Sequence, residues 1–332
     1  MIAGRTTTVL GSGVAAAACA LFAARHGPVR LCGRAATPDP SVESVPAATL
    51  TLLLELGVTP PELDVDRLSR DRRVAWEHPD PTVHSGPACA HVDRAALHAA
   101  LWNRALRHPD VQVTGRRGGL ADGPGRVIDA TGRRALTAAD VLRPPRTWTA
   151  ATISLPGGAD RALHLAAAPD GYAYRLGSAR RVTVGWVGPD RPPRDAAALA
   201  RRIEESGCGW LLTGLDLPPG TATVRRPAGL AVSTAPPGVV PIGDAALTRD
   251  ALASQGLSLA LSDACLAADP AVTAAALAAR RVDAVSRHLQ HLRSTVAACR
   301  FSRSPAWAGY GAWLDGVAST TWLPRSSKRT SP

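Results

Sequence analysis

The sequence predicts an α/β fold with three parts: a Rossmann-like lobe with a parallel sheet, an inserted lobe with an antiparallel sheet, and C-terminal helices. Three observations lead to this prediction. Residues 6–34 have the pattern of a strand, a glycine turn, a helix and a second strand. Residues 146–232 alternate between apolar and polar side chains, as antiparallel strands do. Residues 257–300 have the apolar spacing of helices.

The N-terminal unit begins with the β-branched segment TTTVL, which favours a strand. A helix is predicted over residues 15–26 with Gly27 as its stop, and PVRLCGR then supplies the next strand. A right-handed crossover through the helix makes the two strands parallel. Between strand and helix, Gly11, Gly13 and Ala16 have the spacing that lets backbone approach a pyrophosphate. This turn alone is also compatible with a Rossmann protein that uses NAD.

The middle of the chain predicts a change of architecture. Residues 38–87 form proline-bounded pieces with one clear helix over 47–56, and an amphipathic helix is predicted over 91–108. The segments VQVTG and RVIDATG then return the chain to the first sheet. Beyond them, the segments TWTAATISL, ALHLAAA, YAYRLG and RVTVGWVG predict antiparallel strands, interrupted by a helix near 196–205.

A second segment with cofactor-binding character lies near residue 250: GVVPIGDAALTRDALASQGLSLALSDA. It predicts a strand that ends at Gly243 and Asp244, followed by a second glycine-containing helix start at Gln255 and Gly256. Two such turns, far apart in the sequence, could meet the two ends of a long cofactor, and together they suggest FAD.

These elements predict a discontinuous FAD-binding domain with an inserted substrate lobe. Helices over 257–268 and about 270–300 complete the FAD-binding domain. The predicted FAD-binding domain comprises residues 1–40, 88–145 and 225–300; the substrate lobe, residues 41–87 and 146–224; a helical extension, residues 301–323; and a disordered tail, residues 324–332.

Composition argues against several other classes of protein. The net charge of +11 comes almost wholly from arginines, which are scattered and not interleaved with aromatic residues, so nucleic-acid binding is not expected. No apolar run is long enough for a membrane helix. The six cysteines form no CxxC pair and have no metal-ligand spacing with histidine, which favours a reducing cytoplasm and predicts no metal site.

Six motifs occur in one order: GSGVAAAACALFAARHG, ESVP, HVDRAAL, VIDATG, DGYAY and IGDAALTRDALASQGLSLALSDA. In order and spacing they resemble the FAD-dependent monooxygenases of the p-hydroxybenzoate hydroxylase fold, over residues 6–310. The segment ESVPAATLTLLLELG and the SQG turn look like the branch near tryptophan halogenases. That branch includes flavoproteins that hydroxylate tryptophan residues while maturing quinone-containing amine and amino-acid oxidases.

The resemblance implies which residues contact FAD. The pyrophosphate would lie against Gly11, Gly13 and Ala16, with Arg34 by the adenosine end. The remaining predicted cofactor contacts are Arg94 from the helix that reaches the cofactor, Thr131 and Gly132 near the dinucleotide, Gly243 and Asp244 at the ribitol, and the backbone N–H groups of Gln255, Gly256 and Leu257 near the flavin pyrimidine edge.

The resemblance also implies a strap against the isoalloxazine that contains Glu43 and Ser44. Glu43 is the predicted catalytic residue, because a carboxylate near a flavin could orient a substrate or accept a proton; an ordinary charge before the helix at Ala47 is the alternative. The tryptophans are expected mainly in the core, and Trp186 is the one candidate among them for a position facing the site.

The chain departs from the family pattern at two positions. Gly33 replaces the acidic residue that usually grips the adenosine ribose, and loss of such a bond costs about 1.5–3 kcal/mol. We therefore expect weakened FAD binding, and Gly33→Glu to tighten it. Ala251 replaces the proline that usually precedes the second glycine turn, which predicts a looser turn.

The implied reaction is hydroxylation of an electron-rich aromatic ring, an indole or a phenol, on a small molecule or on a peptide or protein. Reduced FAD would react with O₂ to give a C4a-hydroperoxide, with electrons from NAD(P)H or a separate flavin reductase. Halogenation is not expected, because its chemistry needs a lysine beside the substrate and Lys328 is the only lysine. The alternatives are a reductase or dehydrogenase of the same fold, or a non-catalytic flavin-fold binding protein.

Overall fold

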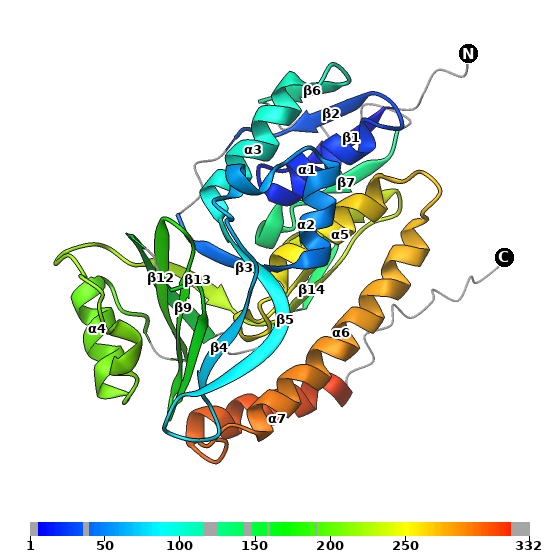
Figure 1. The fold of residues 1–332 in the computed structure, drawn as a ribbon. Helices are drawn as coiled ribbons and strands as arrows, with labels where there is room; N and C mark the ends of the chain where they lie inside the picture. Colours follow the sequence, from blue (N-terminus) through cyan, green and yellow to red (C-terminus); the bar gives the residue numbers. More distant parts are fainter. Residues whose placement is uncertain are drawn as a thin grey trace.

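The computed structural model describes residues 6–35, 40–115, 125–142, 148–157, 160–189 and 191–319. Its first lobe contains a five-stranded sheet, all parallel, in the order β15-β7-β1-β2-β6 (Figure 1). The strands are β1 (Thr7–Leu10), β2 (Val29–Cys32), β6 (Val111–Thr114), β7 (Val127–Asp129) and β15 (Val239–Pro241). The predicted parallel sheet is confirmed. It includes β15, which follows β1 by more than 200 residues in the chain and pairs with β7.

Helices α1 (Val14–Ala23), α3 (Arg94–Arg107) and α5 (Gly256–Ala268) surround the glycine turn of this lobe, and α2 (Ala47–Glu55) contacts α5. Helix α1 is apolar on all sides because α3 and α5 both pack against it. The core of this lobe also includes Leu31, Ile128 and Leu261, all fully buried. The helix ends at Ala23, three residues before the predicted His26.

The second lobe is built on an eight-stranded sheet in the order β13-β9-β12-β11-β10-β4-β5-β3. All neighbours are antiparallel except β10 and β4. The strands are β3 (Val42–Pro46), β4 (Ser69–Ala75), β5 (Thr82–Asp93), β9 (Trp148–Pro156), β10 (Leu163–Ala168), β11 (Gly171–Gly177), β12 (Arg181–Gly188) and β13 (Val224–Ala228).

Strands β4 and β5 were not predicted. The segment SRDRRVA of β4 is highly charged, so it lacks the apolar alternation that marks a strand. Pairing with β10 and β5 determines its conformation. Residues 91–93 extend β5, so α3 begins at Arg94 and not at the predicted residue 91.

Helices cover both faces of the large sheet. One face packs against α4 (Ala196–Glu205) and the 3₁₀ helix η3 (Gly209–Leu212). The other packs against α6 (Ala274–Ala297) and α7 (Pro305–Ser319) through an aromatic cluster of Trp76, Trp148, Tyr172, Trp307 and Tyr310. Figure 1 shows α6 running from the parallel-sheet lobe to the base of the large sheet.

A small third sheet contains β16 (Leu247–Thr248), β14 (Ala231–Thr234) and β8 (Asp140–Leu142). Short 3₁₀ helices occur at Pro60–Leu63 (η1), Gly132–Arg134 (η2), Gly243–Ala245 (η4) and Ala251–Ala253 (η5). The predicted tail, 324–332, lies outside the described residues. Within the described part of the chain, no helix is long and apolar enough to cross a membrane.

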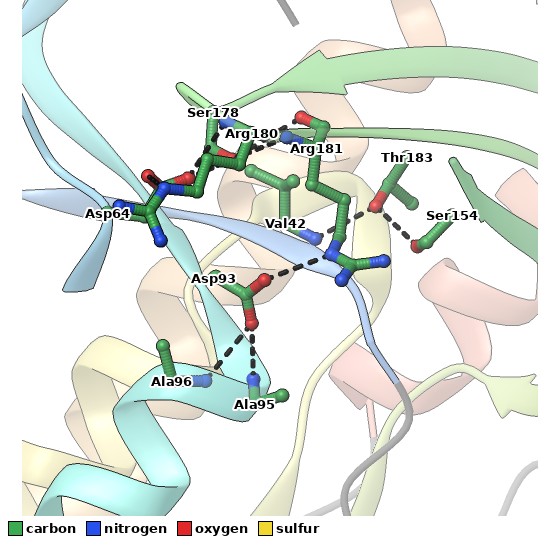
Figure 2. Close-up of polar contacts among 10 residues, drawn as sticks. All are labelled: Val42, Asp64, Asp93, Ala95, Ala96, Ser154, Ser178, Arg180, Arg181 and Thr183. Atoms are coloured by element: carbon green, nitrogen blue, oxygen red, sulfur yellow. Dashed lines mark hydrogen bonds and ion pairs between the residues drawn. The ribbon is translucent and has the colours of Figure 1, made fainter. Parts of the chain in front are cut away.

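Charged side chains fix the two lobes to each other at the start of α3 (Figure 2). The Asp93 carboxylate caps α3 by accepting from the N–H groups of Ala95 and Ala96, at 2.8 and 3.1 Å, and its other oxygen accepts from Arg181 Nε at 2.9 Å. Because Arg181 belongs to β12, this cap also joins α3 to the large sheet. The position of Arg94, one residue further on, is therefore fixed relative to both lobes.

Candidate cofactor-binding site

The first glycine turn has one glycine that packing requires and one that leaves open space. At Gly11, φ is +141° and a Cβ would lie 2.3 Å from the carbonyl oxygen of Ala130, so β1 and the chain after β7 approach too closely for any side chain. At Gly13, the N-cap of α1, no described atom lies within 4 Å of a Cβ position, and no side chain caps the helix. Ala16 is fully buried beneath the turn.

Gly243 brings the two predicted cofactor segments together. It has φ +55°, and its Cβ position is 3.2 Å from the Cβ of Ala260 and 3.5 Å from that of Ala15. The end of β15 thus fits between α1 and α5. The N–H of Gly243 donates to the buried carboxylate of Asp263 in α5 at 3.4 Å. This role of Asp263 was not predicted from the sequence.

Asp244 and the ATG turn also meet. Arg133, two residues after Thr131, has its Nε 3.4 Å from the Asp244 carboxylate, and both side chains are more than one-third exposed. At Gly132, φ is +66° and no described atom lies within 4 Å of a Cβ position. Asp244 therefore combines an ion pair with an exposed edge that can still accept a hydrogen bond.

Asp129 holds the ATG turn in place, a role that the sequence analysis did not assign. Its buried carboxylate accepts four hydrogen bonds: from the N–H and hydroxyl of Thr131, at 2.8 and 2.6 Å, and from the N–H and hydroxyl of Thr137, at 3.0 and 2.6 Å. A single buried carboxylate thus fixes a segment of nine residues. An aspartate just before a Thr-Gly turn was the available sequence signal.

The interpretation of Gly33 as a missing acidic residue needs correction. A Cβ at Gly33 would lie 1.9 Å from the carbonyl oxygen of Gly11 and 3.2 Å from Ser12 Oγ. The end of β2 therefore packs directly on the glycine turn, and this contact excludes every side chain. Arg34 follows as an exposed residue whose N–H donates to Ser12 Oγ at 3.2 Å. In this geometry Gly33→Glu would disrupt the turn and not supply a ribose ligand.

Glu43 and Arg94, predicted separately, form an ion pair with Oε1 and Nη1 2.5 Å apart. Glu43 lies on β3 and Arg94 is the first residue of α3, and β3 pairs with β5 so that Val42 is opposite Asp93. Burial raises the pKa of the Tyr174 phenol in β11, and the negative charge of Glu43 raises it further. Strand β3, helix α3 and strand β11 therefore come together at Glu43. Ser44 is half-buried in β3, opposite His91.

The second glycine turn begins α5. Gln255 is its N-cap without a side-chain cap, its Oε1 accepts from Arg249 Nη1, and no described atom lies within 4 Å of a Cβ at Gly256. Leu257 is half-buried in the first turn of the helix and packs against the core of the parallel-sheet lobe.

Asp250 stabilises the loop in which Ala251 replaces proline. Its buried carboxylate caps η5 by accepting from the N–H of Leu252 at 2.9 Å, and it accepts from the Tyr310 hydroxyl at 2.7 Å. Burial raises the pKa of Asp250 above its ordinary value. A capped turn tied to α7 thus constrains the backbone that proline would otherwise constrain.

Trp186, the one tryptophan considered as a candidate to face the site, lies in the core instead. Trp186 is buried on the face of the large sheet that packs against α4, with the Arg202 guanidinium 4.9 Å from its ring centroid. Side chains alternate between faces along a strand, so its neighbour Val187 lies in the aromatic cluster on the other face. Tyr174 on β11 also packs against that cluster.

The fold is shared with solved structures of FAD-dependent monooxygenases and flavin-dependent halogenases. The solved structures with this fold include the peptidyl tryptophan dihydroxylase QhpG, described as essential for tryptophylquinone cofactor biogenesis, with 21% identity and a TM-score of 0.72 over 97% of this chain and 81% of that one. HpxO of Klebsiella pneumoniae, solved with FAD, has 17% identity and a TM-score of 0.64 over 96% of this chain and 95% of that one.

The flavin-dependent halogenase CmlS has 18% identity and a TM-score of 0.67 over 89% of this chain; the match spans 65% of CmlS. At these identities the comparisons establish the fold. No family model matches the sequence, and no curated protein matches it.

Proposed function

We propose that this protein is an FAD-dependent monooxygenase that hydroxylates an electron-rich aromatic ring. The observation that carries the proposal is the arrangement of three open glycines, Gly13, Gly132 and Gly256. Two lie at helix N-termini, and Gly243 packs directly between those two helices. A dinucleotide needs both features: close backbone approach at its phosphates and a second contact along its length.

The residues present fit FAD. The N-terminus of α1 has no acidic residue in its first turn, so its N–H groups and helix dipole favour the pyrophosphate. Asp244 would accept from the ribitol, and Arg34 would lie by the adenosine. At the start of α5, the N–H groups of Gly256 and Leu257 would stabilise negative charge on the flavin pyrimidine edge. Bound FAD, once reduced, supplies the electrons that activate O₂ for oxygen transfer.

The chain's own residues would position the substrate and exclude water. The Glu43–Arg94 pair would hold the strap against the flavin, with Glu43 orienting the substrate or accepting a proton. The Tyr174 phenol, which stays protonated because burial raises its pKa, can serve as a hydrogen-bond donor.

The proposed ring is an indole or a phenol, on a small molecule or on a peptide or protein. The similarity to QhpG, a peptidyl tryptophan dihydroxylase, supports the indole. The electrons that reduce the flavin would come from NAD(P)H or from a separate flavin reductase. Halogenation is disfavoured because residues 1–327 contain no lysine.

A single-turnover experiment tests the reaction type. Protein loaded with FAD is reduced chemically, then mixed with isotopically labelled O₂, bromide and a panel of indole, phenol and a tryptophan-containing peptide. We expect one substrate class to gain labelled oxygen and no bromine, detected by mass spectrometry. Bromine in the product would contradict the proposal, and a reduced product without oxygen uptake would favour a reductase.

A further inference from the structure

The carbonyl oxygen of Ser12, inside the first glycine turn, accepts two hydrogen bonds from α3. His98 Nε2 lies 2.8 Å from it and Trp102 Nε1 lies 3.2 Å from it. His98 and Trp102 are four residues apart, so they occupy one face of the helix, with ring centroids 6.0 Å apart. Their side chains are buried, with 5% and 1% of the residue exposed.

The chemistry of the two rings fixes the direction of these bonds. An indole N–H can only donate, and a carbonyl oxygen can only accept, so His98 must carry a proton on Nε2. Burial lowers the pKa of His98; the bond to Ser12 opposes this, and the charge of Arg94 lowers the pKa further. His98 is therefore a neutral imidazole with its proton on Nε2 at pH 7.

The two bonds determine where the next N–H points. No cis peptide occurs among the described residues, and in a trans peptide the C=O and the following N–H point in opposite directions. With the Ser12 carbonyl held toward α3, the N–H of Gly13 is directed away from α3. Gly13 is the residue whose Cβ position is open.

We infer that His98 and Trp102 form a lock on the Ser12–Gly13 peptide that presents the Gly13 N–H to the anionic phosphates of the dinucleotide. This inference rests on the proposed function. Without the lock, rotation of this peptide would direct the Ser12 carbonyl dipole at the phosphates, which repels them. The lock holds the glycine turn in its binding conformation before the ligand binds. It therefore increases affinity by lowering the cost of ordering the turn. His98 and Trp102 are positioning residues and need not touch the cofactor.

The test measures FAD and ADP dissociation constants by calorimetry, with thermal unfolding recorded for each variant. We expect His98→Leu to weaken binding of both ligands about tenfold and Trp102→Phe about threefold. His98→Gln, whose amide can donate from near the Nε2 position, should recover most of the loss. ADP is included because it contains the pyrophosphate and lacks the flavin.

His164→Leu is the matched control. His164 is 4% exposed and stacks on Trp210, with ring centroids 5.5 Å apart, on the face of the large sheet that contacts η3. The His164→Leu substitution should lower the unfolding temperature without changing the dissociation constant of FAD or of ADP. Unchanged affinity in His98→Leu, or equal weakening in His98→Leu and His164→Leu, would overturn the lock while leaving the proposed function intact. A wild-type protein that binds neither ligand would overturn both.

Discussion

Replacing Gly33 by glutamate is expected to destabilise the protein by about 3 kcal/mol and to abolish FAD binding. A Cβ at this position would lie 1.9 Å from the carbonyl oxygen of Gly11. Backbone atoms on β1 and β2 cannot move apart there without breaking parallel hydrogen bonds, including the one from the Gly11 N–H to the Cys32 carbonyl at 3.0 Å. Gly33→Ala introduces the same Cβ and should be nearly as harmful.

Urea denaturation and an FAD titration measure the two effects. Gly115→Glu is the control, because Gly115 follows β6 at the edge of the same sheet and no described atom lies within 4 Å of a Cβ there. This variant should change stability by less than about 0.5 kcal/mol. A Gly33→Glu protein that is stable and binds FAD more tightly than wild type would show that an acidic residue can occupy this position, against the packing described above.

Removing the carboxylate of Asp129 is expected to have the second largest effect. Asp129→Ala leaves four donors without their acceptor, two on the half-buried Thr131 and two on the buried Thr137, at a cost of about 4 kcal/mol. The ATG turn then loses its fixed conformation, so FAD affinity should fall as well. Asp129→Asn keeps one oxygen and can satisfy one threonine, so we expect about half the loss of stability.

Chemical denaturation of the two variants gives the graded comparison, and Asp140→Ala is the control. The exposed Asp140 accepts a hydrogen bond from the neighbouring Val141 N–H, and its removal should be close to neutral. If Asp129→Ala and Asp140→Ala were equally stable, the four hydrogen bonds would contribute nothing to the turn.

Local patterns predicted the elements whose ends have glycine or capping signals. The strand, turn and helix around Gly11 and Gly13, the helix after Pro46, and strands β11 and β12 all belong to this group. In each of these elements, the apolar periodicity and the local backbone preferences favour the same secondary structure. It could therefore be predicted without knowledge of the tertiary contacts.

Pairing between distant strands determined what the sequence could not predict. The ion pair of Glu43 with Arg94 exists because β3 pairs with β5, and β5 was not predicted because its first half is exposed and a glycine and a proline interrupt it. The close contact at Gly33 likewise depends on how β2 packs on the glycine turn, which residue type alone does not reveal. Asp129 and Asp263 bond to backbone N–H groups, and such contacts have no sequence periodicity.

Binding of FAD by the paired glycine turns is tested most directly by calorimetric titration of the purified protein with FAD. We expect saturable one-to-one binding with a dissociation constant below about 10 μM, accompanied by quenching of flavin fluorescence. No heat of binding and no fluorescence change with FAD at about 100 μM would contradict the claim, because the open glycines would then serve no dinucleotide.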